Sequence, residues 1–224
     1  MAVGTYDIFS LLHVLAFVYW LGADLGVLYA ARYGADERLP IETRQTIGDI
    51  MAFIDLFPRL SVPLIGATGA TLAYLSGSFR IEEIWLWVGW LAALVWISSN
   101  LFIYMNRANP ERASGVVLFD TLWRIILLVA IAGVAVASLL GVGITSSISL
   151  GAKLLIFAMA IALSLVLRLL FRPYRPALRR IVEHGDNATD TAIMKKALAS
   201  ARPVVILIWL LTIAAAAIGL WKPF

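Results

Sequence analysis

The sequence predicts an all-α, polytopic membrane protein of about six transmembrane helices. Hydrophobic residues make up 62% of the 224-residue chain and charged residues only 14%, whereas a soluble domain has about 45–50% apolar and about 25% charged residues. The apolar residues fall into long stretches, each close to the roughly 20 residues with which a helix crosses a bilayer. One soluble core could not bury so much apolar surface, so lipid must solvate much of the chain.

The predicted spans cover residues 6–31, 51–75, 84–105, 116–140, 151–171 and 204–221. Proline breaks or kinks a helix because it lacks a backbone N–H and clashes with the preceding turn. We therefore expect Pro58 and Pro63 to kink the second span beside Arg59, and Pro203 to mark the start of the last span. All spans belong to a single membrane domain, residues 1–224.

Two of the polar segments between the spans should contain short helices. In residues 32–50, Pro40 can open an interfacial helix, because proline suits the first turn. Residues 172–203 should form two short helices separated at Gly185, with Asp190 as the cap of the second.

Lys and Arg are distributed unevenly between the two sides of the predicted bundle. Twelve of them lie in the loops 32–50, 106–115 and 172–203, and only Arg80 and Lys222 lie on the other side. The positive-inside rule therefore predicts that these three loops are cytoplasmic and that both termini are periplasmic, in a bacterial inner membrane. The net charge of +4 then serves contact with anionic lipid headgroups, not with nucleic acid.

Several kinds of site are excluded by residues that the sequence lacks. With no cysteine, the chain has no disulfide, thiolate metal site or cysteine nucleophile. It contains no HExxH, P-loop or GxSxG motif, and its methionines are scattered, which excludes a copper(I) ladder. His184 lies in a predicted loop, so His13 is the one intramembrane histidine and a bis-histidine haem within one protomer is excluded.

The periplasmic half of the bundle holds the first group of candidate site residues. His13 and Lys153 both lie within about two turns of the periplasmic ends of their spans. His13 shares a helical stripe with Trp20, which should face the bundle interior. An imidazole can ligate a metal or haem iron or relay protons, and the alternative is a histidine that is hydrogen-bonded to a neighbouring helix. Lys153 can neutralise an anionic group, or its ammonium can reach the headgroups.

The cytoplasmic half holds a second, larger group of polar residues. It consists of Asp24, Arg59, Asn100, Asp120 and Arg124, with Asp55 slightly nearer the water. The simple interpretation is a buried ion-pair network that holds four helices together, with Asp24–Arg59 as its deepest pair. The alternative is an entry path for protons or anions, because such networks can line water-filled cavities. Arg168 is expected to extend to the cytoplasmic face.

Short motifs on three spans resemble a broad superfamily of small bacterial membrane proteins, which includes CopD-type copper-resistance proteins, DUF2269-type proteins and HemJ-type protoporphyrinogen oxidases. The motifs are Leu11-Leu12-His13 with Tyr19-Trp20-Leu21-Gly22, Arg59-Leu60-Ser61 with Thr68-Gly69, and Gly151-Ala152-Lys153-Leu154-Leu155. The HemJ resemblance implies haem b ligation at His13 and an essential role for Lys153. The CopD resemblance implies copper handling across the inner membrane. This chain is longer than the HemJ branch and lacks the Met and His enrichment expected of the copper branch.

Three functions follow as hypotheses. The first is a haem-b-binding redox protein with His13 as the metal ligand, which exchanges electrons with quinone or a membrane-protein partner and can act as a homodimer. The second is a non-catalytic accessory or assembly subunit of a larger membrane complex. The third is a permease for a small solute or a metal ion such as copper, gated by the cytoplasmic polar residues.

Overall fold

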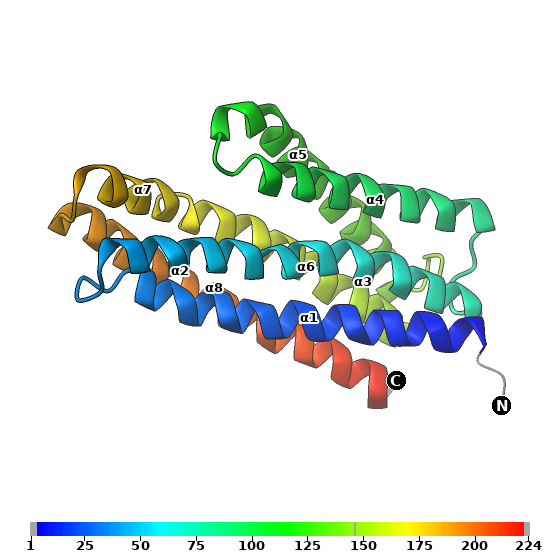
Figure 1. The fold of residues 1–224 in the computed structure, drawn as a ribbon. Coiled ribbons are helices and arrows are strands. Elements are labelled where there is room, and N and C mark those ends of the chain that lie inside the picture. Colours follow the sequence, from blue (N-terminus) through cyan, green and yellow to red (C-terminus); the bar gives the residue numbers. More distant parts are fainter. Residues whose placement is uncertain (1–3, 146, 222–224) are drawn as a thin grey trace.

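The computed structural model describes residues 4–145 and 147–221, and this part of the chain contains helices and no strands. Six of the helical segments are long and apolar enough to cross a membrane, which confirms the predicted fold class of a polytopic helical bundle. The first residue of α1 and the last of α8 lie at the same end of the bundle (Figure 1). We call the opposite end, which carries the polar loops rich in Lys and Arg, the basic end.

The helices that contain most of the predicted spans are α1 Thr5–Gly34, α3 Leu56–Leu75, α4 Glu83–Met105, α5 Pro110–Leu139, α6 Ile148–Phe171 and α8 Ala188–Trp221. At the start of α1 the Asp7 carboxylate accepts a hydrogen bond from the Gly4 N–H at 3.0 Å, which satisfies a free donor of the first turn. Pro110 opens α5, where its missing N–H is not needed.

Two shorter helices, α2 Ile41–Ile54 and α7 Tyr174–His184, lie at the basic end. The helix expected after Pro40 is confirmed, but it continues to Ile54 and so includes the first residues of the predicted second span. The break between α2 and α3 falls at Asp55. Pro58 explains its position, because a proline there offers no N–H to the carbonyl of Ile54, four residues earlier.

The start of α8 differs from the prediction in two respects. The predicted break at Gly185 is present, with φ of 91°, but the cap of α8 is Asn187, whose side-chain oxygen accepts from the Asp190 N–H at 2.8 Å. Pro203 does not begin the last span: it lies inside one continuous helix of 34 residues. Proline is tolerated inside membrane helices where packing and neighbouring groups satisfy the freed carbonyl.

The bundle is held together by two separate apolar clusters. In the membrane, α1 packs against α3 and α8, α6 packs against α5 and α8, and α4 joins α3 to α5. Trp20, Trp96 and Ile161 belong to the cluster between these helices. The second cluster, around Tyr174 and Met194, joins the end of α1 to α2, α7 and the first turns of α8. We call this second group the end cap.

Candidate functional site

The half of the membrane near the termini contains one histidine, His13 on α1. Its ring is half-buried, and its Nδ1 lies 2.9 Å from the hydroxyl oxygen of Thr68 on α3. The prediction of a partner on a neighbouring helix is therefore confirmed, and the partner is a residue of the motif that carried the family resemblance.

The hydrogen bonds of Thr68 determine which ring nitrogen of His13 carries a proton. The Thr68 hydroxyl oxygen lies 2.6 Å from the carbonyl oxygen of Leu64. A carbonyl can only accept, so the Thr68 hydroxyl donates to Leu64 and can then only accept from His13. Nδ1 therefore bears the hydrogen, and in the neutral ring Nε2 carries the lone pair. This is the arrangement in which a histidine offers Nε2 to a metal.

The His13 ring also packs against the backbone of α3. A Cβ atom built on Gly69 would lie 3.1 Å from Cε1 of the ring, closer than ordinary van der Waals contact. Glycine at position 69 therefore lets the imidazole approach α3 closely enough to reach Thr68. The sequence pair Thr68-Gly69 thus has two complementary roles toward one ring.

Lys153, on α6, lies in the same region as His13, and the two side chains interact electrostatically. Its Nζ also lies 3.9 Å from the position that a Cβ would take on Gly219 of α8. Trp20 takes another place: it is buried in the membrane cluster with Val62 of α3. The three residues of the predicted cofactor site therefore divide into a His13–Lys153 region and a buried tryptophan.

An apolar groove of about 290 Å³ runs along the contact between α1 and α3, on the surface that faces lipid. Thr68, Ala16 and Trp90 line one end, and Tyr19 and Phe57 line the other. His13 does not line the groove, but its partner Thr68 does. The sequence did not predict this groove, because its two walls lie far apart along the chain.

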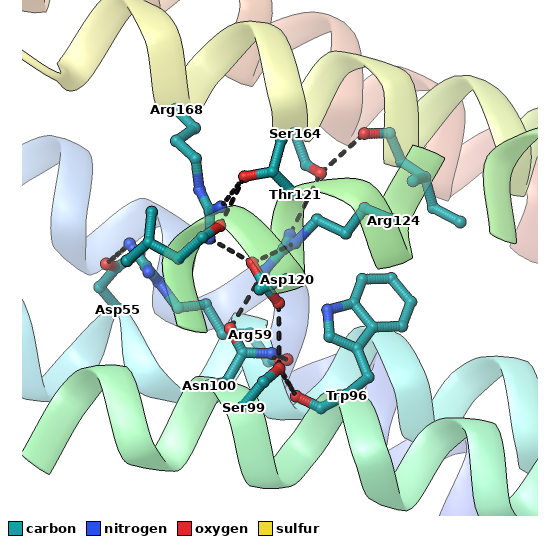
Figure 2. Close-up of polar contacts among 12 residues, drawn as sticks. Asp55, Arg59, Trp96, Ser99, Asn100, Asp120, Thr121, Arg124, Ser164 and Arg168 are labelled. Carbon is teal, nitrogen blue, oxygen red and sulfur yellow. Dashed lines mark hydrogen bonds and ion pairs between the residues drawn. The ribbon is translucent and has the colours of Figure 1, made fainter. Parts of the chain in front are cut away.

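The polar network nearer the basic end is centred on Asp120 of α5, which is fully buried. Its carboxylate accepts from Arg124 Nε at 3.0 Å and from Arg168 Nη2 on α6 at 2.5 Å. It also accepts from the hydroxyl of Ser99 on α4 at 3.2 Å (Figure 2). The predicted extension of Arg168 to the membrane face is wrong, because a buried carboxylate offers this guanidinium a stronger partner than water.

The other two nitrogens of Arg124 and the second terminal nitrogen of Arg168 also have hydrogen-bond partners. Arg124 Nη2 donates to the Asn100 side-chain oxygen at 3.0 Å and Nη1 donates to Ser164 at 3.4 Å. Arg124 also lies over the Trp96 ring, 5.1 Å from its centroid. Arg168 Nη1 donates to the Thr121 hydroxyl at 2.8 Å.

Arg59 does not form the predicted pair with Asp24. Its Nη2 lies 2.5 Å from the Asp55 carboxylate, which is four residues earlier and so on the same side of the α2–α3 junction. Asp24 interacts electrostatically with both of these groups, but no salt bridge joins it to Arg59 within the described ranges. Ser99, Thr121 and Ser164 were missed by sequence reasoning, since isolated hydroxyl residues in apolar helices carry no spacing signal.

Metal chemistry is restricted by the available donors. Among the described residues, no group of three or more His, Asp or Glu side chains comes together around a possible ion. Among the described residues, His13 Nε2 is the one imidazole nitrogen within the membrane that could ligate a metal.

No family model, no curated protein and no solved structure matches the chain.

Proposed function

We propose that this integral membrane protein is a redox protein that binds haem b through Nε2 of His13. The observation that carries the proposal is the hydrogen-bond series from His13 Nδ1 through the Thr68 hydroxyl to the Leu64 carbonyl. An acceptor that binds the N–H of one ring nitrogen orients a histidine and raises the basicity of the other nitrogen toward a metal. Thr68, which accepts from His13 Nδ1, supports this role for His13.

Haem suits this donor set better than a bare metal ion does. A copper or zinc ion needs several protein ligands, and the described residues include no group of three or more His, Asp or Glu side chains that could hold one. A haem would bring pyrrole nitrogens of its own, so His13 alone could hold it, and it would supply one-electron chemistry when bound. A second copy of the chain could contribute a further ligand, so we also propose a homodimer.

Lys153 and the groove support a redox role for the same region. The ammonium of Lys153 lies in the same region as the His13 ring and can neutralise a propionate or a quinone oxygen. The groove of about 290 Å³ is open to lipid and ends at Thr68. A hydrophobic carrier such as quinone can therefore approach the residue that orients His13 without leaving the bilayer.

The proposed location is the bacterial inner membrane, with both termini in the periplasm. The support is the concentration of Lys and Arg in the loops of the basic end, which favours a cytoplasmic position for that end. His13 and Lys153 then lie toward the periplasmic face.

The visible spectrum of the purified protein, with haem supplied during expression, tests the proposal. We expect a Soret band that is lost in His13→Ala and kept in His184→Ala, which removes the other of the two histidines. Wild-type protein without a Soret band, or equal spectra for the two variants, would contradict it.

A second candidate function, an accessory or assembly subunit, is favoured by the saturation of the Asp120 network. Each guanidinium nitrogen of Arg124 has a partner on α4, α5 or α6. Such a network fixes helices relative to one another, and the same saturation is less suited to a permease, in which polar groups must exchange partners. Co-purification with a larger complex, together with a colourless protein, would favour this candidate.

A further inference from the structure

A small polar pocket opens at the basic end, where the α2–α3 junction meets α4 and α7. Asp55, Arg59, Asn100, Tyr104 and Arg175 supply its polar lining. Its volume is about 20 Å³, and about 10–15 Å³ is enough for one water-sized atom. The pocket therefore admits a single ligand oxygen and not a whole metabolite.

One of the two arginines that line this pocket has no hydrogen-bonded acidic partner. Arg59 already uses the Asp55 carboxylate, at 2.5 Å. The described residues give Arg175 neither a hydrogen bond nor a salt bridge. Arg175 is therefore the guanidinium of the pocket whose N–H groups are left for an external anion.

We propose that Arg175 and Arg59 bind the phosphate group of an anionic phospholipid headgroup at this pocket. A guanidinium presents N–H groups in a fork that matches phosphate oxygens. One phosphate oxygen enters between the two side chains, and the other atoms of the headgroup stay at the membrane surface. Basic pockets between membrane helices are suited to such headgroups.

The pocket is connected to the buried network by Asn100. The Asn100 amide donates to the Arg59 carbonyl at 3.4 Å, and its side-chain oxygen accepts from Arg124 Nη2 at 3.0 Å. Farther along the network, Asp120 pairs with two guanidinium groups. A bound phosphate that contacts Arg59 and Arg175 would link α3 and α7 next to the end of α4.

The size and lining of the pocket favour a lipid over free phosphate as the source of the anion. Inorganic phosphate would bury one oxygen and leave the others in water with little further contact. A phospholipid gains apolar contact as well, because Leu56 and Ile103 line the same pocket. The apolar outer surfaces of the helices continue from there along the bilayer.

Native mass spectrometry of the full-length protein in detergent, titrated with phosphatidylglycerol, tests the proposal. We expect a saturable site that is about tenfold weaker in Arg175→Gln, because charge-assisted hydrogen bonds are lost. Arg179→Gln is the matched control: it removes the same charge from an exposed position of the same helix. Arg179 does not line the pocket, and its side chain pairs with Glu183. An unchanged unfolding midpoint in Arg175→Gln would show that the variant folds.

Competition with inorganic phosphate distinguishes a phospholipid headgroup from free phosphate as the bound group. Phosphatidylglycerol that is not displaced by inorganic phosphate, with phosphatidylcholine bound weakly, supports a lipid site. Binding of inorganic phosphate alone would overturn the lipid source. Equal weakening in Arg175→Gln and Arg179→Gln, or no effect in either, would overturn the site itself.

Discussion

Two buried arginines, Arg44 in the end cap and Arg124 in the membrane, hold their regions together in different ways. The Arg44 side chain is fully buried, with Nε donating to the Gly34 carbonyl at 2.9 Å and Nη1 lying 3.0 Å from the Asp186 carboxylate. The Asp186 side chain is 33% exposed. Arg124 pairs with Asp120, which is 0% exposed.

The difference lies in how far water can replace a lost partner. At the end cap, the acidic partner of Arg44 reaches solvent. The other two partners of Arg44 are neutral, the Gly34 carbonyl and the Thr191 hydroxyl. In the membrane, neither Arg124 nor Arg168 can exchange Asp120 for water, so Coulomb attraction is weakly screened and desolvation is expensive. Removing one charged group should therefore lower the free energy of unfolding more in the membrane than in the end cap.

The largest effect is expected from Asp120→Asn. This change keeps the shape of the side chain but leaves Arg124 and Arg168 without their shared carboxylate. We expect a loss of about 3–5 kcal/mol of unfolding free energy, as for a broken buried ion pair. Unfolding in mixed micelles measures it. A loss of unfolding free energy smaller than that of Arg44→Met in the end cap would contradict the higher cost expected in the membrane.

A smaller loss is expected from Arg44→Met, which removes the buried charge and keeps much of the apolar volume. The Gly34 carbonyl loses its hydrogen-bond donor, while the Asp186 carboxylate can turn to solvent. We therefore expect a loss of about 1–3 kcal/mol of unfolding free energy. The same unfolding assay measures it. Arg38→Met, in the exposed loop before α2, is the control and should change the unfolding free energy little.

The smallest effect concerns Asp36, outside the membrane. Hydrogen bonds from the Arg38 side chain and backbone lower the pKa of the Asp36 carboxyl from 3.8 to about 2. Because the folded-state pKa is lowered, the stabilisation is complete above pH 3.8 and is lost as the pH falls through about 2. Unfolding midpoints of wild type and Asp36→Asn should differ slightly near neutral pH and converge over this interval. A difference independent of pH would contradict the assignment.

Much of the fold could be predicted because lipid imposes one strong constraint: each span must be a helix of roughly 20 predominantly apolar residues. The ends of the helices were harder to predict. Pro203 looked like a helix start, yet α8 passes through it, because its polar first turns pack against α7 in the end cap. This contact between α7 and α8 cannot be inferred from the residues around Pro203 alone.

The partners within the polar network could be predicted only in part. Asp120 and Arg124 are four residues apart, so their pairing on one helix face was accessible from spacing. The choice of Asp55 over Asp24 by Arg59 depends on where α2 ends, and the recruitment of Arg168 depends on how α5 packs against α6. Both pairings depend on how the helices pack, which cannot be inferred from the spacing of residues in a single sequence.

We propose that two regions of the molecule have separate roles: the Asp120 network holds the helices together, and His13, oriented by Thr68, would hold the proposed haem. The most direct test is the haem stoichiometry of the folded fraction of Arg168→Gln and Thr68→Val, measured side by side. We expect Arg168→Gln to be less stable but to bind haem like wild type. We expect Thr68→Val to bind haem at least about tenfold more weakly, because the hydrogen-bond partner that orients the His13 ring is lost. Loss of haem in Arg168→Gln together with full binding in Thr68→Val would contradict it.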